Sequence, residues 1–215
     1  MRAIQNFLRN FALEIYTYKM AINNYKNITV FGASSAQVDK VFHDAAYALG
    51  KLFAENNITC VCGAGRSGLM QAVSDGELEN GGKVTGVIPR FMVENGWCHD
   101  GLTETIVTED MHERKETMSR LADAIVALPG GCGTLEELLE IITWKQLGLF
   151  HGTVIILNTN GFYNHLINML QHCIDEHFMK ASHATLWNIA STPEDVMNIL
   201  ATTDSSKSLT IESKY

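Results

Sequence analysis

Short apolar runs alternate with longer stretches in which apolar residues recur every three or four positions. The short runs, rich in β-branched residues, cover 28–31, 58–62, 83–88, 105–108, 124–128 and 153–157. Runs of this length and composition are typical of buried parallel strands, and the stretches between them have helical spacing. This alternation predicts an α/β protein with a Rossmann-like, doubly wound parallel sheet covered by helices on both faces, in three α/β/α layers.

The pattern also predicts how the rest of the chain is organised. We expect one Rossmann-like domain over residues 27–202, preceded by an amphipathic helix within 1–26 and followed by a polar, mobile tail over 203–215. Asp110 is expected to cap one helix, and Thr192 followed by Pro193 to open another. Further elements are helices over 38–55 and 162–178, a helix from the 130s through Trp144, a short strand over 186–189, and an irregular stretch over 89–103.

The first 23 residues carry a single apolar stripe at steps of three and four. The stripe consists of Ile4, Phe7, Phe11, Ile15, Tyr18 and Ile22. Arg9 and Asn10 interrupt any continuous apolar run, which argues against a signal peptide. We expect this helix to pack on its own domain or on a partner subunit rather than on a membrane surface.

Charge and cysteine usage narrow the classes of function. Sixteen basic against 24 acidic residues give a net charge of −8, which argues against a general nucleic-acid binder. The chain has five cysteines and no Cys-x-x-Cys pair, which indicates reduced thiols in a cytoplasmic protein rather than a disulfide framework. No apolar run approaches membrane-spanning length, and no histidines stand at metal-ligand spacing.

The central stretch is Leu128-Pro129-Gly130-Gly131-Cys132-Gly133-Thr134-Leu135-Glu136-Glu137, between a predicted strand and a predicted helix. Its glycines allow a ligand to approach the backbone, and the free N–H groups of the following helix end favour an anion. We therefore predict a phosphate-binding turn, without the lysine of a P-loop. Spacing alone favours another interpretation, in which Thr134 caps the helix and Glu137 completes a capping box without any chemical role.

Two more small-residue turns follow predicted strands. The first is Gly32-Ala33-Ser34-Ser35, and the second, Gly63-Ala64-Gly65-Arg66-Ser67-Gly68, matches a dinucleotide-binding fingerprint. That fingerprint also requires an acidic residue at the end of the next strand, where Pro89 stands instead. We expect Asp75, Glu77 and Glu79 to form a solvated helix face. Because turns after parallel strands meet at one edge of the sheet, a single crevice is predicted to collect all three.

A basic pair, Arg114-Lys115, lies upstream on the helix that Asp110 is expected to open. Met111, Arg114, Lys115 and Met118 share one face by helical spacing, so both basic residues can reach the next strand's carboxyl end. Taken alone, without the downstream glycine turn, the pair is better explained as exposed charges that balance Glu113 and Glu116.

Together these motifs resemble the LONELY GUY family, whose signature is Pro-Gly-Gly-x-Gly-Thr-x-x-Glu with an Arg-Lys pair before it. Pro129 to Glu137 matches every fixed position, and the resemblance extends from about Ile28 to Leu200. It implies hydrolysis of the N-glycosidic bond of cytokinin riboside 5′-monophosphates, with Arg114 and Glu137 as catalytic residues. Substrate or phosphate contacts are implied at Gly32, Ser34, Ser35, Gly63, Gly65, Glu94, Lys115, Gly130, Gly131, Cys132, Gly133, Thr134 and Thr143.

The resemblance has departures. Ala64 replaces the middle glycine of the family's second turn, and Gly96 stands where many members have glutamate, with Glu94 two residues earlier. Thr143 lies six residues past Glu137, which is not a same-face spacing, so its contact rests on the resemblance alone. We expect residues 89–103 to cover the base of the substrate.

The chemistry expected for Glu137 is that of a glycosidase carboxylate, which stabilises a cationic sugar or orients the attacking water. Arg114 is expected to hold the ribose or the phosphate, or to help the purine leave. The resemblance implies no metal or organic cofactor, and a homodimer or larger assembly. The alternatives are an AMP nucleosidase for unmodified AMP, a non-catalytic nucleotide-binding module, a pyridoxal-dependent decarboxylase and an NAD oxidoreductase.

Overall fold

A seven-stranded, entirely parallel sheet forms the centre of the protein, as seen in a computed structural model that describes residues 17–203. The order across the sheet is β4-β3-β2-β1-β5-β6-β7. The strands are β1 Asn27–Phe31, β2 Thr59–Cys62, β3 Lys83–Pro89, β4 Glu104–Thr108, β5 Ala124–Ala127, β6 Thr153–Leu157 and β7 Asn188–Ala190. The predicted doubly wound parallel sheet is confirmed, and its order reverses between β1 and β5.

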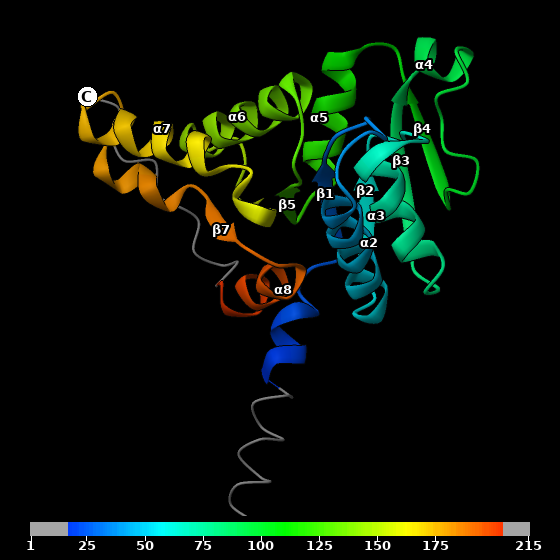
Figure 1. Cartoon of the computed structure of the whole chain (residues 1–215), viewed down its shortest axis with the longest axis horizontal. Helices are drawn as coiled ribbons and strands as arrows, with labels where there is room; N and C mark the ends of the chain where they lie inside the picture. The colour runs from blue at the N-terminus through cyan, green and yellow to red at the C-terminus, as the bar shows by residue number, and fades with distance from the viewer. Residues whose placement is uncertain (1–16, 204–215) are drawn as a thin grey trace, which may run out of the picture.

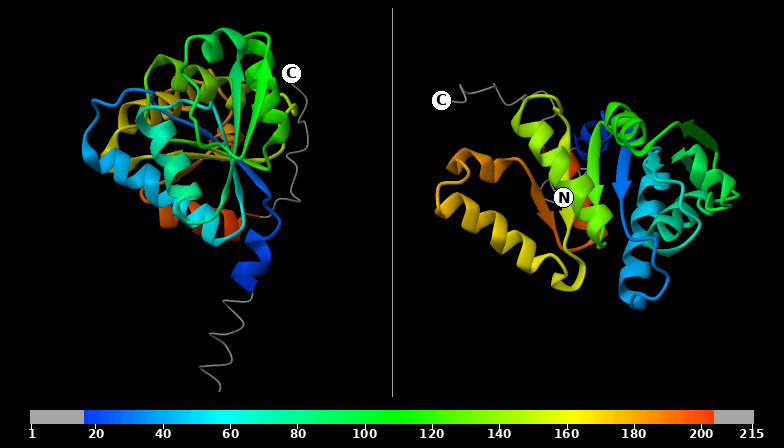
Figure 2. Two further views of the ribbon diagram at one scale, coloured as in Figure 1. Left: turned by 90° about the vertical axis from the view of Figure 1, so that its right-hand side faces the viewer. Right: turned by 90° about the horizontal axis from the view of Figure 1, so that it is seen from above.

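Helices connect successive strands, as right-handed parallel crossovers require. They are α2 Lys40–Glu55, α3 Gly68–Leu78, α4 Arg90–Glu94, α5 Met111–Leu121, α6 Cys132–Gln146, α7 Asn164–Asp175 and α8 Pro193–Thr202, with short 3₁₀ turns η1 Thr159–Gly161 and η2 Ala181–Thr185. Figure 1 shows α2 and α3 side by side, and Figure 2 shows the strands in the interior with helices around them.

Two apolar layers cover the sheet because alternate strand residues face opposite sides. Ile28 and Val30 of β1 belong to the layer formed with α2, α3 and α8. Phe31 of the same strand belongs to the layer formed with α5, α6 and α7. The three-layer arrangement expected from the alternation of elements is therefore confirmed.

The two predicted helix starts have the expected local chemistry. The Asp110 carboxylate accepts hydrogen bonds from the backbone N–H groups of His112 at 2.8 Å and Glu113 at 2.9 Å. Thr192 accepts from the Asp195 N–H at 3.1 Å, and Pro193 occupies the first helical turn. Capping therefore fixes where α5 and α8 begin.

Some predicted boundaries and one predicted surface differ from the structure. Residues 89–103 contain the one-and-a-half-turn helix α4, and the helix expected over 162–178 is limited to Asn164–Asp175. The solvated face expected for α3 is wrong at Glu77, whose side chain is fully buried. Gly82 makes room for it, since a Cβ there would lie 2.4 Å from Glu77 Cγ.

The end of the predicted N-terminal helix is helical over residues 17–22. Ile22 is buried in the layer with α2 and α8, and Tyr18 packs against the same layer. This end of the stripe therefore packs on its own domain. The rest of that helix and most of the predicted tail, residues 1–16 and 204–215, lie outside the described residues. Among residues 17–203, no helix is long and apolar enough to cross a bilayer.

Candidate active site

A cavity of about 640 Å³ opens at the carboxyl ends of the central strands, where the sheet order reverses. Its size is that of a small-molecule site, and its position is where α/β sheets of this kind bind ligands. The three small-residue turns after β1, β2 and β5 meet there, as predicted from sequence. Of the predicted site residues, it is lined by Gly32, Ser34, Ser35, Gly63, Gly65, Arg114, Gly131, Gly133, Thr134 and Glu137.

The turn before α6 presents the end of a helix to this cavity. Gly131 is the N-cap, and its carbonyl accepts the first helical hydrogen bond from Leu135 N–H at 3.0 Å. The amides of Cys132, Gly133 and Thr134 therefore precede that bond at the positive end of α6. Gly130 lies just outside the cavity lining, and a Cβ there would meet Thr134 Oγ1 at 2.1 Å, which explains the glycine.

The alternative interpretation of this turn, a capping box between Thr134 and Glu137, is wrong. Thr134 lies inside α6 rather than at its cap, and no side chain caps this helix. Glu137 Oε1 instead accepts a hydrogen bond from Arg114 Nη1 at 2.7 Å. Sequence spacing was unable to distinguish the two because Arg114 comes from another helix, 23 residues earlier in the chain.

The Arg114–Glu137 ion pair is almost completely buried, although both residues line the cavity. Their side chains are only 7% and 10% exposed. Burial raises the pKa of the Glu137 carboxyl above its usual range, and the positive charge of Arg114 partly offsets that rise. The pair therefore places a desolvated carboxyl group beside the end of α6, where a bound ligand would contact it.

Arg114 is held on two further sides by the chain itself. Its Nε donates to the Val87 carbonyl at 3.1 Å. A Cβ at residue 63 would lie 2.0 Å from Arg114 Nη2, so the bare backbone of Gly63 is what lets the guanidinium lie against the end of β2. These contacts fix the direction in which Arg114 meets Glu137.

Lys115 points away from this cavity. Its ammonium group pairs with Glu136 and, at 3.0 Å, with Glu140, so that it joins α5 to α6 outside the cavity lining. Burial lowers the pKa of Lys115, but the hydrogen bonds and charges of Glu136 and Glu140 together outweigh that effect, so the pKa is raised. These ion pairs favour a structural role for Lys115 over the phosphate contact that the family resemblance implies.

Three other predicted contacts are not brought to the cavity lining. Glu94 lies exposed at the end of α4, and Cys132 is exposed at the start of α6. The Thr143 hydroxyl is exposed and donates back to the Leu139 carbonyl of its own helix at 2.8 Å. A substrate contact from any of these side chains stays a prediction.

An apolar wall completes the cavity, and sequence analysis did not assign it residue by residue. It consists of Met70, Ile88, Met92, Trp97 and Met111, with Arg66 and Ser67 beside it. Met92 and Trp97 lie in the stretch expected to cover the base, so their position there agrees with that expectation. The clearest signal was the aromatic and methionine content of residues 89–103.

Ala64 shows the physical cost of one departure from the family pattern. Its φ is 57°, in the left-handed region that glycine enters freely and alanine does not. The turn after β2 thus keeps the shape that a glycine would favour.

Among the described residues, His, Cys, Asp and Glu side chains form no group of three or more that could bind a metal ion.

Fold and cavity together define a class: a Rossmann-like protein with a helix N-terminus and a buried Arg–Glu pair facing a cavity at the switch point of its sheet. The chain belongs to the LONELY GUY family, because the family model described as "possible lysine decarboxylase" matches residues 70–200 and several curated members are close relatives.

Two plant relatives and one solved structure illustrate the similarity. The probable cytokinin riboside 5′-monophosphate phosphoribohydrolase LOGL2 of Oryza sativa subsp. japonica is 39% identical, over 83% of this chain and 73% of its own. The phosphoribohydrolase LOG7 of Arabidopsis thaliana is 42% identical, over 73% and 72%. The molybdenum cofactor carrier protein of Chlamydomonas reinhardtii is 21% identical, with a TM-score of 0.65 over 82% of this chain and 96% of its own, which shows a shared fold.

Proposed function

We propose that this protein hydrolyses the N-glycosidic bond of adenosine 5′-monophosphate or its N6-substituted, cytokinin-type derivatives, and releases the free base and ribose 5-phosphate. The observation that carries the proposal is the buried Arg114–Glu137 pair, which lies in the same cavity as the helix end of α6. An anion-binding turn next to a desolvated carboxyl is what cleavage of a nucleotide at its sugar requires.

The two ends of the cavity suit the two ends of such a substrate. The 5′-phosphate is placed at the amides of Gly133 and Thr134, where the partial positive charge of α6 favours an anion. The base is placed against the apolar wall that includes Met92 and Trp97. This orientation brings the ribose between them, beside Glu137.

Glu137 then acts on the anomeric carbon. As the bond from C1′ to the base nitrogen breaks, its electron pair leaves with the base and positive charge develops on the sugar. An ionised Glu137 stabilises that charge or orients the water whose oxygen bonds to C1′. The departing base takes up a proton, which balances the hydrolysis.

Arg114 has the role of holding and ionising Glu137. Its Nη1 bonds to the carboxylate at 2.7 Å and its Nε bonds to the Val87 carbonyl, so the guanidinium is fixed before any ligand binds. Its charge lowers the pKa of Glu137 against the opposing effect of burial. This supports the carboxylate form that the reaction uses.

The assembly and compartment are part of the proposal. We infer a homodimer or larger homo-oligomer in the cytoplasm, with reduced thiols. The five cysteines are free, in agreement with reduced thiols, and the assembly is inferred from the resemblance to the family. Light scattering of the purified protein tests the assembly, and a monomeric mass would contradict it.

The activity is tested by incubating the protein with AMP and with isopentenyl-AMP, and by separating base and ribose 5-phosphate by chromatography. We expect both products in equal amounts from at least one substrate. No product from either, with circular dichroism showing folded protein, would contradict the proposal. Turnover that persists in the Glu137→Gln variant would contradict the role of Glu137.

A further inference from the structure

The chain between α4 and β4 folds back over the turn that follows β2. The Trp97 carbonyl accepts from the Arg66 N–H at 3.2 Å, and the His99 N–H donates to the Ala64 carbonyl at 2.9 Å. Between them, Cys98 forms an isolated antiparallel bridge with Gly65. We call residues 95–101 the wall segment, because this pairing holds Trp97 at the cavity with its side chain 52% exposed.

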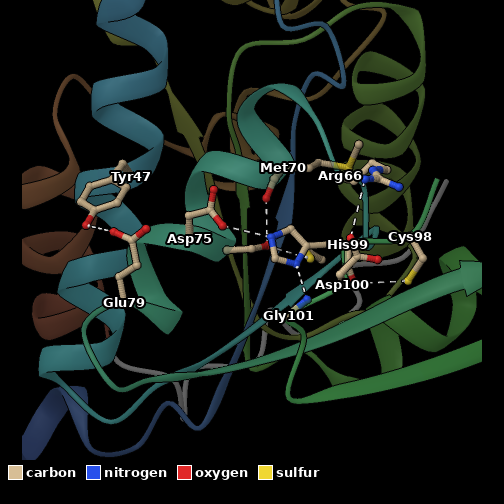
Figure 3. Close-up of polar contacts among 11 residues, drawn as sticks. Tyr47, Arg66, Met70, Asp75, Glu79, Cys98, His99, Asp100 and Gly101 are labelled. Atoms are coloured by element: carbon tan, nitrogen blue, oxygen red, sulfur yellow. Dashed lines mark hydrogen bonds and ion pairs between the residues drawn. The ribbon is translucent and has the colours of Figure 1, made fainter. Parts of the chain in front are cut away.

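The side chain of His99 anchors this segment to α3. Its Nε2 lies 3.0 Å from Asp75 Oδ1, and its Nδ1 accepts a hydrogen bond from the Gly101 N–H at 3.0 Å (Figure 3). Because Nδ1 accepts, the ring hydrogen is on Nε2 and is donated to Asp75. Both ring nitrogens are thus used, and the side chain is only 12% exposed.

A second anchor is weaker. Arg66 Nη1 donates to the Gly96 carbonyl at 3.1 Å, and Nη2 lies 3.6 Å from Asp100 Oδ2. Figure 3 shows Arg66 and Asp100 on the same side of the segment as Cys98. The side chains of this ion pair are 55% and 87% exposed, so water screens it. His99 is therefore the main side-chain contact between the wall segment and the rest of the domain.

We propose that His99 is a positioning residue: together with Asp75 it holds the wall segment so that Trp97 forms the face against which the substrate's base stacks. This inference rests on the proposed function, because it names a determinant of base binding at the same cavity. His99 does not line the cavity and acts through Trp97. Arg114 comes from α5 and Glu137 from α6, so the reacting groups do not depend on this anchor.

The separation of anchor and reacting groups predicts a split between KM and kcat. Stacking of a base on an aromatic side chain contributes enough affinity that its loss weakens binding about tenfold. We expect His99→Ala to raise KM for isopentenyl-AMP about tenfold and to leave kcat within about twofold. Trp97→Ala is expected to do the same. The double variant is expected to add little to either, because both changes remove one contact.

Asp75 provides a matched pair of variants. Asp75→Asn keeps an oxygen that can accept the His99 Nε2 hydrogen, and we expect its KM to stay near that of the wild type. Asp75→Ala removes the acceptor and is expected to behave like His99→Ala. Asp75 lies on the surface of α3, 33% exposed, so thermal unfolding of both variants should match the wild type. An unchanged KM in Asp75→Ala would overturn the proposal.

Amide hydrogen exchange gives a readout that does not depend on turnover. In His99→Ala, the amides of residue 99 and Gly101 should exchange faster, because the first loses its support and the second loses its acceptor. The Leu135 amide, which donates to the Gly131 carbonyl at 3.0 Å in α6, lies outside the wall segment and serves as the internal control. Unchanged exchange at both positions, or an unchanged KM, would overturn the positioning role.

Failure of the two proposals can be told apart. If the wild-type protein binds AMP but releases no base, only the proposed function is contradicted, and the positioning role can still be tested. The dissociation constant of AMP, measured by equilibrium dialysis, then replaces KM. A roughly tenfold weaker binding by His99→Ala supports the positioning role, and equal binding overturns it.

Discussion

Two of the glutamates that the structure describes are buried, at opposite ends of the sheet. Glu137 lies at the carboxyl ends of the strands, beside the cavity, and is paired with Arg114. Glu77 lies at the amino ends and accepts hydrogen bonds from the backbone N–H groups of Cys60, at 3.1 and 3.2 Å, and Lys83, at 3.1 Å. Burial raises the pKa of both carboxyls, that of Glu77 to about 8.

The difference between them separates a reactive carboxyl from a structural one. Glu137 has a cation that favours its ionised form and an open space for a substrate. Glu77 has only backbone donors and is fully enclosed, so it ties the starts of β2 and β3 to α3. A buried acid is therefore a candidate catalyst only when a counter-charge and access occur together.

The largest effect is expected from Glu137→Gln. Gln is nearly the same size but cannot carry the negative charge, so kcat should fall about a thousandfold. Thermal unfolding monitored by circular dichroism checks that the fold is kept. Glu77→Gln is the matched control at the other end of the sheet and should keep kcat within about twofold. Equal losses in both variants would break the comparison.

Arg114→Met is expected to have the next largest effect. It removes the charge that favours ionised Glu137, so kcat should fall roughly a hundredfold at neutral pH. The pKa of Glu137 should then rise further, because no positive charge offsets the effect of burial. The acidic limb of the kcat/KM profile, which in the wild type lies above the usual glutamate range, should shift to higher pH. An unchanged pH profile would show that Arg114 does not favour the ionised form of Glu137.

Glu77→Gln should change how stability depends on pH. The Glu77 pKa rises from 4.5 to about 8 on folding, so between these values the folded protein keeps a proton that the unfolded chain loses. Wild-type stability therefore falls as pH rises through this window, and the Gln variant lacks that fall. Urea unfolding should show the variant gaining roughly 3–4 kcal/mol on the wild type between about pH 5 and pH 8. If the unfolding free energies of the wild type and the variant changed in parallel with pH, the shifted pKa of Glu77 would be contradicted.

The smallest effect is expected from Lys115→Met. The residue follows Arg114 directly but pairs with Glu136 and Glu140 outside the cavity. Loss of these partly exposed ion pairs should cost about 1 kcal/mol of unfolding free energy and leave KM within about twofold. A large rise in KM would restore the phosphate-binding role that its sequence motif allows.

The hydrophobic pattern of the sequence was sufficient to predict the sheet, because alternating strands and helices leave few ways to connect parallel strands. It also placed the turns at Gly32, Gly63 and Gly130 at one edge. It failed for Glu77, since its burial depends on Gly82 and on donors from two strands. The pairing of Glu137 was equally beyond spacing, because a capping box and a tertiary ion pair look the same within one helix. The position of Trp97 at the cavity was also not predictable, because it depends on the bridge between its neighbour Cys98 and Gly65, which no local sequence pattern specifies.

Gly63, which directly follows β2, limits which substitutions this protein can tolerate. Residue 63 has no functional group, yet a single methyl there would occupy the space of the Arg114 guanidinium, 2.0 Å from Nη2. Every other amino acid would turn that side chain aside and release Glu137 from its partner. Position 63 should therefore rank among the least replaceable in the chain, and a variant survey that scores only chemically active side chains would overlook it.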